Sequence, residues 1–266
     1  MASQIKISGG LVFLALVFSG RVWAEEITMA CTDHYRPYSY QVNNEPRGIY
    51  AHILGELFQR MGYEHRIKIL PFKRVLCMTR SGQVTGMAGA FFTPKRDEYA
   101  LFICNVPLAR ISQSLFILNA NPIDKAKAVN FQGGLIGHKR GFLIPGEFIV
   151  AAEKKMIRTI DAERTDQLID MLIRGRLDGF IHNTFHVLAH IENHGRQTKI
   201  KHLPLFSARD RPAFIAFSRK ALKTLPESFP VQVQNTLGAM HKEGFIQALQ
   251  PRCNPPTIES RKEKSK

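Results

Sequence analysis

The chain has 266 residues, 44% of them hydrophobic, and 37 basic residues against 22 acidic ones give a formal net charge of +15 at pH 7. This length and hydrophobic content are enough for a packed core and for one or two domains. The positive charge favours anionic partners such as acidic small molecules, anionic membrane surfaces or cell-wall polymers. No nucleic-acid-binding motif occurs, so we expect no nucleic-acid partner.

The first 24 residues are typical of a cleaved secretory signal peptide. Lys6 precedes an apolar stretch from Leu11 to Phe18, and Val-Trp-Ala stands before Glu25 as a cleavage site. The apolar stretch is short for a membrane span and Arg21 interrupts its end, so a retained anchor is the weaker alternative. We therefore expect residues 1–24 to be removed and the mature chain to lie in the periplasm.

Four cysteines, Cys31, Cys77, Cys104 and Cys253, would then enter an oxidising compartment. They allow three full disulfide pairings, between which the sequence does not choose. No Cys-x-x-Cys spacing occurs, and no histidine lies at zinc-ligand spacing from another candidate. We expect no metal centre and no cofactor.

The first half of the mature chain alternates strands with helices. Apolar residues recur at helical spacing from Ile49 to Phe58, and Gly62 ends that helix. This alternation predicts a βαβαβ unit with a parallel sheet wrapped by helices. Its strands are expected at 27–32, 65–70 and 86–92, and its second helix at 72–80.

The second half repeats this pattern, which predicts a second α/β lobe. Strands are expected at 112–118, 135–138, 158–160, 177–181, 200–203 and 213–217, and helices at 147–156, 162–174, 184–193 and 229–249. We assign lobe 1 to 25–117 and 206–256, lobe 2 to 118–205, and a basic tail to 257–266. Extended crossings near 118 and 205 would act as the hinge, and a cleft between two lobes is where small ligands usually bind.

Arg96 is the first candidate ligand-binding residue. The small apolar residues from Gly86 to Phe92 predict a buried strand, which ends in a Thr-Pro turn at Thr93, and Arg96 opens a short helical turn. This places Arg96 at the carboxyl edge of a sheet, where open α/β folds bind ligands. Its guanidinium can hold a carboxylate with two parallel hydrogen bonds. The alternative is a surface arginine paired with Asp97 or Glu98.

Several short motifs follow one another along the chain, and together they resemble the type II periplasmic solute-binding proteins. They are Thr32–Tyr40, Arg47–Ile49, Arg80–Gly82, Thr93–Arg96, Asn105–Leu108 and Arg174–Gly179. The closest resemblance is to family 3, the extracellular receptors for polar amino acids that serve ABC importers. It covers essentially the whole mature chain. It implies an α/β fold with two lobes, a hinge between them and closure on a ligand, in a protein expected to be a monomer.

The resemblance also implies which residues of lobe 1 contact a ligand. Arg96 would bind its carboxylate, with Thr93 in the same turn, and Tyr35 would cover it beside the polar Asp33. The family usually has hydroxyl side chains before the Thr-Pro turn, where this chain has Gly89 and Phe91.

Two further stretches complete the expected site. The second lobe would close through Gly141 and Phe142, where the family has small or hydroxyl residues. Arg74 opens the helix that follows Pro71 and could direct a second cation at the cleft, although a solvent-facing side chain is an equal alternative.

Asn183 is the largest departure from the family pattern. The family places there an aspartate that pairs with the ligand ammonium, and an asparagine cannot neutralise a charge. Burying an ammonium without a counter-ion is costly, so a carboxylate without an amine, such as an organic or aromatic acid, fits equally well or better. The alternative is that Asn183 only caps the helix that starts at Thr184.

His182, His186 and His190 recur at i, i+4 and i+8. This spacing would place them on one helical face, which could hold a metal or respond to pH near 6. No acidic third ligand lies nearby, so we expect an exposed polar face instead.

Three functions remain open at this point. The first is a solute receptor that captures a small carboxylate ligand and delivers it to an inner-membrane ABC permease. The second is a degenerate flytrap that acts as a sensor or binds protein partners, which the apolar Phe91 and Phe142 favour. The third is a secreted enzyme similar to cyclohexadienyl dehydratases, which would need a cleft acid or base from Asp33, Glu147 or His182. We expect binding and no enzymatic activity.

Overall fold

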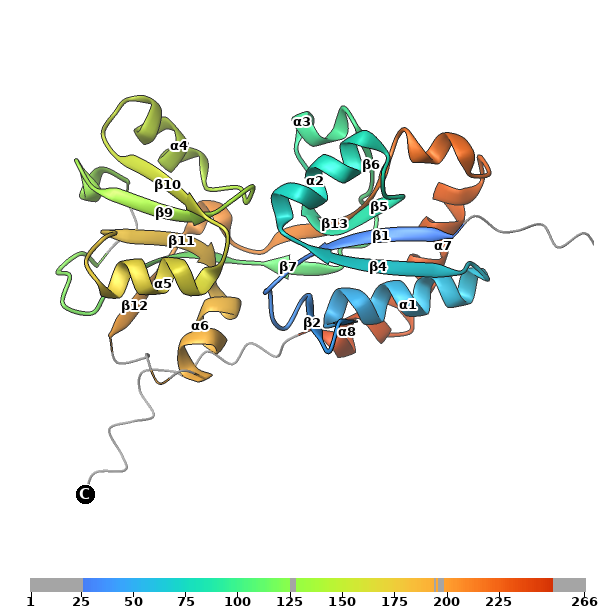
Figure 1. Cartoon of the computed structure of the whole chain (residues 1–266), viewed down its shortest axis with the longest axis horizontal. Helices are drawn as coiled ribbons and strands as arrows, with labels where there is room; N and C mark the ends of the chain where they lie inside the picture. The colour runs from blue at the N-terminus through green and yellow to red at the C-terminus, as the bar shows by residue number, and fades with distance from the viewer. Residues whose placement is uncertain (1–25, 125–127, 194, 196–198, 251–266) are drawn as a thin grey trace, which may run out of the picture.

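The computed structural model describes residues 26–124, 128–193, 195 and 199–250. They form two lobes that lie side by side, each built on its own sheet (Figure 1). The expected signal peptide, Cys253 and the basic tail 257–266 lie outside the described residues. Within the described part, no helix has both the length and the apolar composition needed to cross a membrane.

Lobe 1 contains a mixed six-stranded sheet. Its strands are β1 (Ile27–Thr32), β4 (His65–Leu70), β5 (Gly86–Phe91), β6 (Ala100–Ile103), β7 (Ala109–Ile111) and β13 (Arg211–Ser218). They are ordered β4-β1-β5-β13-β6, with β7 also paired to β13. β1 runs parallel to β4 and β5, so the expected βαβαβ unit is confirmed. The expectation of an all-parallel sheet was wrong, because β13 returns from the other lobe and inserts antiparallel beside β5.

The helices of lobe 1 pack on both faces of this sheet. They are α1 (Ile49–Met61), α2 (Phe72–Ser81), α3 (Pro94–Asp97), α7 (Phe229–Lys242), α8 (Phe245–Leu249) and the 3₁₀ turn Ala221–Thr224. α1 and α7 share one buried cluster with Ile27 and Met29, whereas Val75 of α2 packs in another with Ala30 and Met87. Alternate residues of β1 therefore face opposite layers, as the period of a strand requires.

Two local features of lobe 1 differ from the expectations. The single helix predicted over 229–249 is two helices, because Gly244 adopts a left-handed conformation with φ 79° and ends the first one. A hairpin of β2 (Tyr40–Val42) and β3 (Glu45–Arg47) was not predicted. Asn43 and Asn44 both take positive φ in its turn, which asparagine tolerates better than most residues.

Lobe 2 has a five-stranded sheet between helices. Its strands β8 (Gln113–Leu118), β9 (Leu135–Lys139), β10 (Arg158–Ala162), β11 (Gly179–Asn183) and β12 (Ile200–Pro204) are ordered β10-β9-β11-β8-β12. On one face Leu115 packs with Phe148 of α4, and on the other Phe116 packs with Leu168 of α5 and Val187 of α6. The helices are α4 (Gly146–Glu153), α5 (Thr165–Ile173) and α6 (Thr184–Asn193), with 3₁₀ turns at Ala128–Phe131 and Phe206–Ala208.

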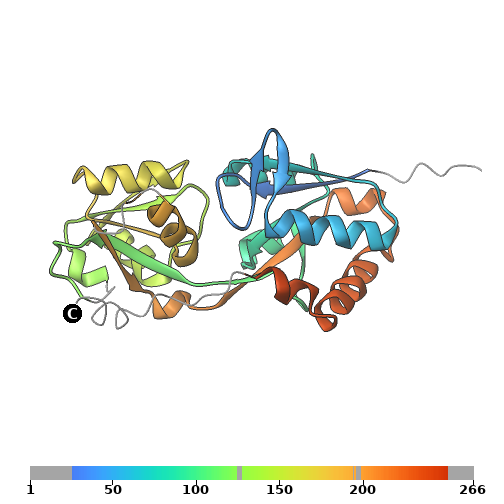
Figure 2. The same ribbon diagram turned by 90° about the horizontal axis from the view of Figure 1, so that it is seen from below.

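Two extended segments connect the lobes, and both are visible at the lower edge of Figure 2. One runs from β7 into β8 through Ser112, and the other runs from β12 to β13. β8 pairs with β11 and β12 of the second sheet, so lobe 2 starts at Gln113 and not at 118 as expected. The strand predicted over 112–118 is real, but it belongs to lobe 2 and the hinge lies at its beginning.

Candidate functional site

The facing surfaces of the two lobes enclose a cavity of only about 20 Å³, roughly the space of one water molecule. Six residues expected in the ligand site line it, and the hinge residues Ile111 and Gln113 form part of its wall. The lining residues are Thr32, Tyr35, Phe72, Gly89, Phe91, Arg96, Ile111, Gln113, Phe142, Leu143 and Asn183. The structure therefore brings six of the expected residues together around a small, almost filled cavity.

Arg96 lies on the lobe 1 side of the cavity with only 6% of its surface exposed. Thr93 caps α3 by accepting a hydrogen bond from the Arg96 backbone, which fixes the start of this short turn. The guanidinium donates from Nη1 to the Phe91 carbonyl at 2.9 Å and from Nη2 to the Gly141 carbonyl of lobe 2 at 3.2 Å. Within the described residues it forms no ion pair with a carboxylate, since Asp97 pairs with Arg219.

Burial lowers the pKa of Arg96 to about 10, and the charge of Arg211 adds to this effect. The group stays protonated at neutral pH all the same. A buried cation whose partners are neutral carbonyls is stabilised less than one that faces an anion. The site is therefore electrostatically suited to a negatively charged group.

The Phe142 ring enters the site from lobe 2 and is surrounded by aromatic rings. It packs edge-on against Tyr35 and Phe72 of lobe 1, with ring centroids 5.5 and 5.1 Å away, and lies 5.3 Å from the His182 ring. Phe142 also packs against both buried clusters of lobe 1. Its side chain thus occupies the space between Tyr35, Phe72 and His182 in the cleft.

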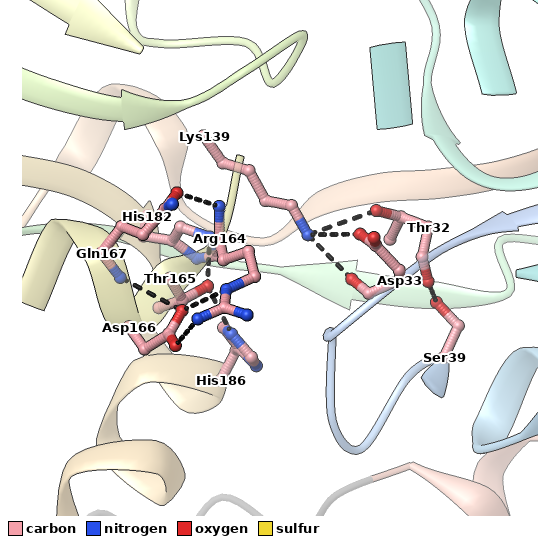
Figure 3. A network of polar contacts seen from close by, with 10 residues as sticks. All are labelled: Thr32, Asp33, Ser39, Lys139, Arg164, Thr165, Asp166, Gln167, His182 and His186. Carbon is pink, nitrogen blue, oxygen red and sulfur yellow. Dashed lines mark hydrogen bonds and ion pairs between the residues drawn. The ribbon is translucent and has the colours of Figure 1, made fainter. Parts of the chain in front are cut away.

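Lys139 crosses the cleft from the end of β9 and was not predicted as a site residue (Figure 3). Its side chain is 1% exposed, and Nζ donates to the Asp33 carbonyl at 2.8 Å. The Asp33 carboxylate and the Thr32 hydroxyl each lie 3.4 Å from Nζ. Burial lowers the pKa of Lys139, and the carboxylate of Asp33 opposes that shift.

Asn183 caps α6, as one of its two expected roles required, and it also contacts lobe 1. Its Oδ1 accepts a hydrogen bond from the His186 backbone at 2.8 Å and so caps α6, while its Nδ2 donates to the Tyr35 hydroxyl of lobe 1 at 2.9 Å. Asn183 is therefore a helix cap and an interlobe contact at once. It contributes no charge to the site.

His182 and His186 are buried, with 0% and 3% exposure, which corrects the expected exposed polar face. His182 belongs to β11 and not to the helix, so the i, i+4 spacing did not describe one helical face. Thr165 Oγ1 lies 3.3 Å from Nε2 of His182 and 2.9 Å from Nε2 of His186 (Figure 3). Nδ1 of His186 reaches the Arg36 carbonyl of lobe 1 at 2.7 Å.

These contacts are all satisfied when both rings are neutral. The Asn183 backbone N–H donates to Nδ1 of His182, so Nε2 of that ring carries the proton and donates to Thr165. Thr165 then donates to Nε2 of His186, whose Nδ1 donates to the Arg36 carbonyl. Burial lowers the pKa of His186 to about 3 and the pKa of His182 well below its usual range.

Gln113 adds an unused acceptor to the cavity wall. Its Nε2 donates to the Leu143 carbonyl at 2.9 Å, whereas its buried Oε1 has no hydrogen-bond partner within the described part of the chain. A buried acceptor of this kind can take a donor from a water molecule or a ligand hydroxyl.

The remaining expected site residues lie around the cavity or away from it. Gly141 contributes its carbonyl to Arg96, and Asp33 lies at a depression of about 660 Å³ that leads outward along the cleft. Arg74 is exposed on α2 and does not line the cavity. Of the candidate acid and base residues, Asp33 is bound to Lys139, His182 is buried and neutral, and Glu147 accepts from Ser207 on the surface.

No cluster of three metal-ligating side chains occurs among the described residues. Cys31, Cys77 and Cys104 are free thiols, and burial raises the pKa of Cys31 to about 12.

The fold and the cleft define a two-lobed solute-binding protein. The sequence matches the bacterial extracellular solute-binding proteins, family 3, over residues 27–252, so the chain belongs to this family. None of the curated proteins matches it significantly in sequence.

Solved structures share the fold at low sequence identity. An ancestral arginine-binding protein bound to arginine superposes with a TM-score of 0.72 at 15% identity, over 84% of this chain and 96% of that one. The arginine-, lysine-, histidine-binding protein ArtJ from Geobacillus stearothermophilus gives 0.68 at 16% identity, over 85% and 93%. The VFT2 domain of BvgS from Bordetella pertussis gives 0.63 at 14% identity, over 84% and 92%.

Proposed function

We propose that this chain is a periplasmic solute-binding protein that captures a small carboxylate ligand between its lobes and delivers it to an inner-membrane ABC permease. The observation that supports this most is Arg96. It is a buried cation at the cleft, it pairs with no carboxylate among the described residues, and its guanidinium contacts one carbonyl from each lobe. A ligand carboxylate would replace neutral acceptors with a charged one and hold the lobes together.

The hinge and the cleft support a closing motion. The lobes are joined by two extended segments, and the groups that meet across the cleft are side chains and carbonyls of both lobes. A ligand that contacts both lobes stabilises the closed state by its difference in affinity between the closed and open states.

A sensor or partner-binding role is the second candidate, and the filled cleft favours it. Phe142 of lobe 2 lines the small cavity and packs against Tyr35 of lobe 1, so an apolar side chain of the protein itself occupies part of the cleft. Two similar structures are the BvgS VFT2 domain and a histidine kinase sensor domain, at 14% and 16% identity.

A thermal-shift panel tests the proposed function, with amino acids, dicarboxylates and aromatic acids applied to the wild type, Arg96→Ala and Arg74→Ala. We expect at least one carboxylate to raise the melting temperature of the wild type and of Arg74→Ala, and to leave Arg96→Ala unchanged. At a hundredfold excess over Kd the stabilisation is about 2.7 kcal/mol, or roughly 5–10 °C for a chain of this size.

The Arg74→Ala variant is the matched control, because it removes an exposed arginine of the same lobe. An equal shift in Arg96→Ala would contradict the assignment of Arg96. A cooperative melt with no shift for any compound would favour the partner-binding alternative.

A further inference from the structure

The Gly141–Phe142 segment occupies the position beside Arg96 where a ligand would bind, and its contacts describe the chemistry of that position. The Gly141 carbonyl accepts from Arg96 Nη2 as a carboxylate oxygen would. The adjoining phenyl ring of Phe142 lies among the rings of Tyr35, Phe72 and His182. A negatively polarised oxygen joined by a short linker to an aromatic ring is therefore what the closed site accommodates.

The charges around this segment disfavour an amine. Lys139 Nζ lies 5.3 Å from the centroid of the Phe142 ring and 5.9 Å from that of Tyr35, so a cation already faces the rings. Asn183 is neutral, and Asp33 is the carboxylate bound to Lys139. An additional ammonium in this space would meet a buried cation and, among the described residues, no free counter-charge, which is unfavourable.

We infer that the ligand is an aromatic carboxylate without an amine, and that it binds by displacing Gly141 and Phe142 from the cleft. This inference rests on the proposed function, in which Arg96 binds a carboxylate. The carboxylate takes the place of the Gly141 carbonyl on Arg96, and the aromatic ring takes the place of the Phe142 ring. Three atoms, the amide nitrogen, Cα and Cβ, separate that carbonyl from that ring, as three methylenes do in 4-phenylbutanoate; 3-phenylpropanoate is an arylalkanoate one methylene shorter.

Phe142 is then an internal competitor of the ligand and not part of the ligand-binding wall. The two roles predict opposite effects of removing its ring. Loss of a wall residue weakens binding, whereas loss of a competitor strengthens it, because the ligand no longer has to displace a packed side chain.

Isothermal titration calorimetry with 3-phenylpropanoate and L-phenylalanine tests the inference, because these two compounds differ only in the α-ammonium group. We expect the wild type to bind 3-phenylpropanoate at least about tenfold more tightly, as an unpaired buried charge costs more than 1.4 kcal/mol. We expect Phe142→Ala to bind it about tenfold more tightly than the wild type does. Phe92→Ala is the control, because Phe92 is an exposed phenylalanine outside the cavity lining, and it should match the wild type.

Lys139→Met tests the charge argument, because it keeps the length of the side chain and removes the cation. We expect Lys139→Met to have a smaller ratio of the affinity for 3-phenylpropanoate to that for L-phenylalanine than the wild type has. Weaker binding in a folded Phe142→Ala, or equal binding of the two compounds, would overturn the inference. If either of these results were found and binding were still lost in Arg96→Ala, the proposed function would stand. If no carboxylate bound to either the wild type or Phe142→Ala, the inference and the proposed function would both fail.

Discussion

Gly89 of β5 allows the backbone of this strand to lie close to the Tyr50 ring of α1 at the cavity. It takes a positive φ of 78° within β5, where the pairing with β13 also shifts register. A Cβ at this position would lie 2.1 Å from Cε2 of Tyr50, which is itself buried. Glycine at this position, where the family usually has a hydroxyl side chain, is therefore required both by the backbone conformation and by the packing against Tyr50.

We predict that Gly89→Ala lowers the free energy of unfolding by about 2–4 kcal/mol, because the side chain overlaps Tyr50 and the backbone conformation becomes strained. Urea denaturation followed by circular dichroism measures the change. Gly238→Ala is the matched control, since Gly238 lies inside α7 with open space around it and should gain up to about 1 kcal/mol. A Gly89→Ala variant as stable as the wild type would show that Tyr50 moves aside at little cost.

The end of β11 and the start of α6 form the element that closes lobe 2 onto lobe 1. Asn183 caps the helix and contacts Tyr35, while His186 connects Thr165 to the Arg36 carbonyl and His182 contacts Thr165. Both histidine pKa values are lowered in the folded state, so the unfolded chain binds more protons when the pH falls below about 6.5. The free energy of unfolding therefore falls on acidification. The contribution of His186 to this fall ends near its folded pKa of about 3.

We predict that the free energy of unfolding falls by about 1 kcal/mol per buried histidine between pH 6 and pH 5. Urea titrations at a series of pH values measure this slope. His186→Gln should remove about half of it, while His241→Gln should leave it unchanged because His241 is exposed on α7. A slope equal in wild type and His186→Gln would mean that His186 is accessible to protons in the folded chain.

The elements at the cleft differ in how far the sequence predicts them. The Thr-Pro turn and the short helical turn that contains Arg96 follow from neighbouring residues, so the sequence predicted both correctly, whereas the cap by Thr93 was not predicted. Lys139 contacts Asp33 at a separation of 106 positions, and no local pattern indicates such a contact. The histidines were misplaced because their spacing fits a helix, whereas His182 ends a strand and lobe packing buries it.

At the scale of the whole molecule, the lobes meet through polar contacts as well as through the packing of Phe142 on lobe 1. Lys139 reaches Asp33, Asn183 reaches Tyr35 and Arg96 reaches Gly141. The net charge of +15 attracts anions to such a molecule, and two buried cations, Arg96 and Lys139, lie at the cleft itself. We therefore predict a receptor selective for anionic ligands that bridge the two lobes.

A calorimetric titration of 3-phenylpropanoate into the wild type, Arg96→Ala and Arg74→Ala tests this account most directly. We predict one-to-one binding to the wild type and to Arg74→Ala, and at least about tenfold weaker binding to Arg96→Ala, because a charge-assisted hydrogen-bonded pair is worth about 1.5–3 kcal/mol. Equal affinity for the wild type and Arg96→Ala would contradict it, because the carboxylate would then bind without the buried cation that forms no ion pair with a carboxylate among the described residues.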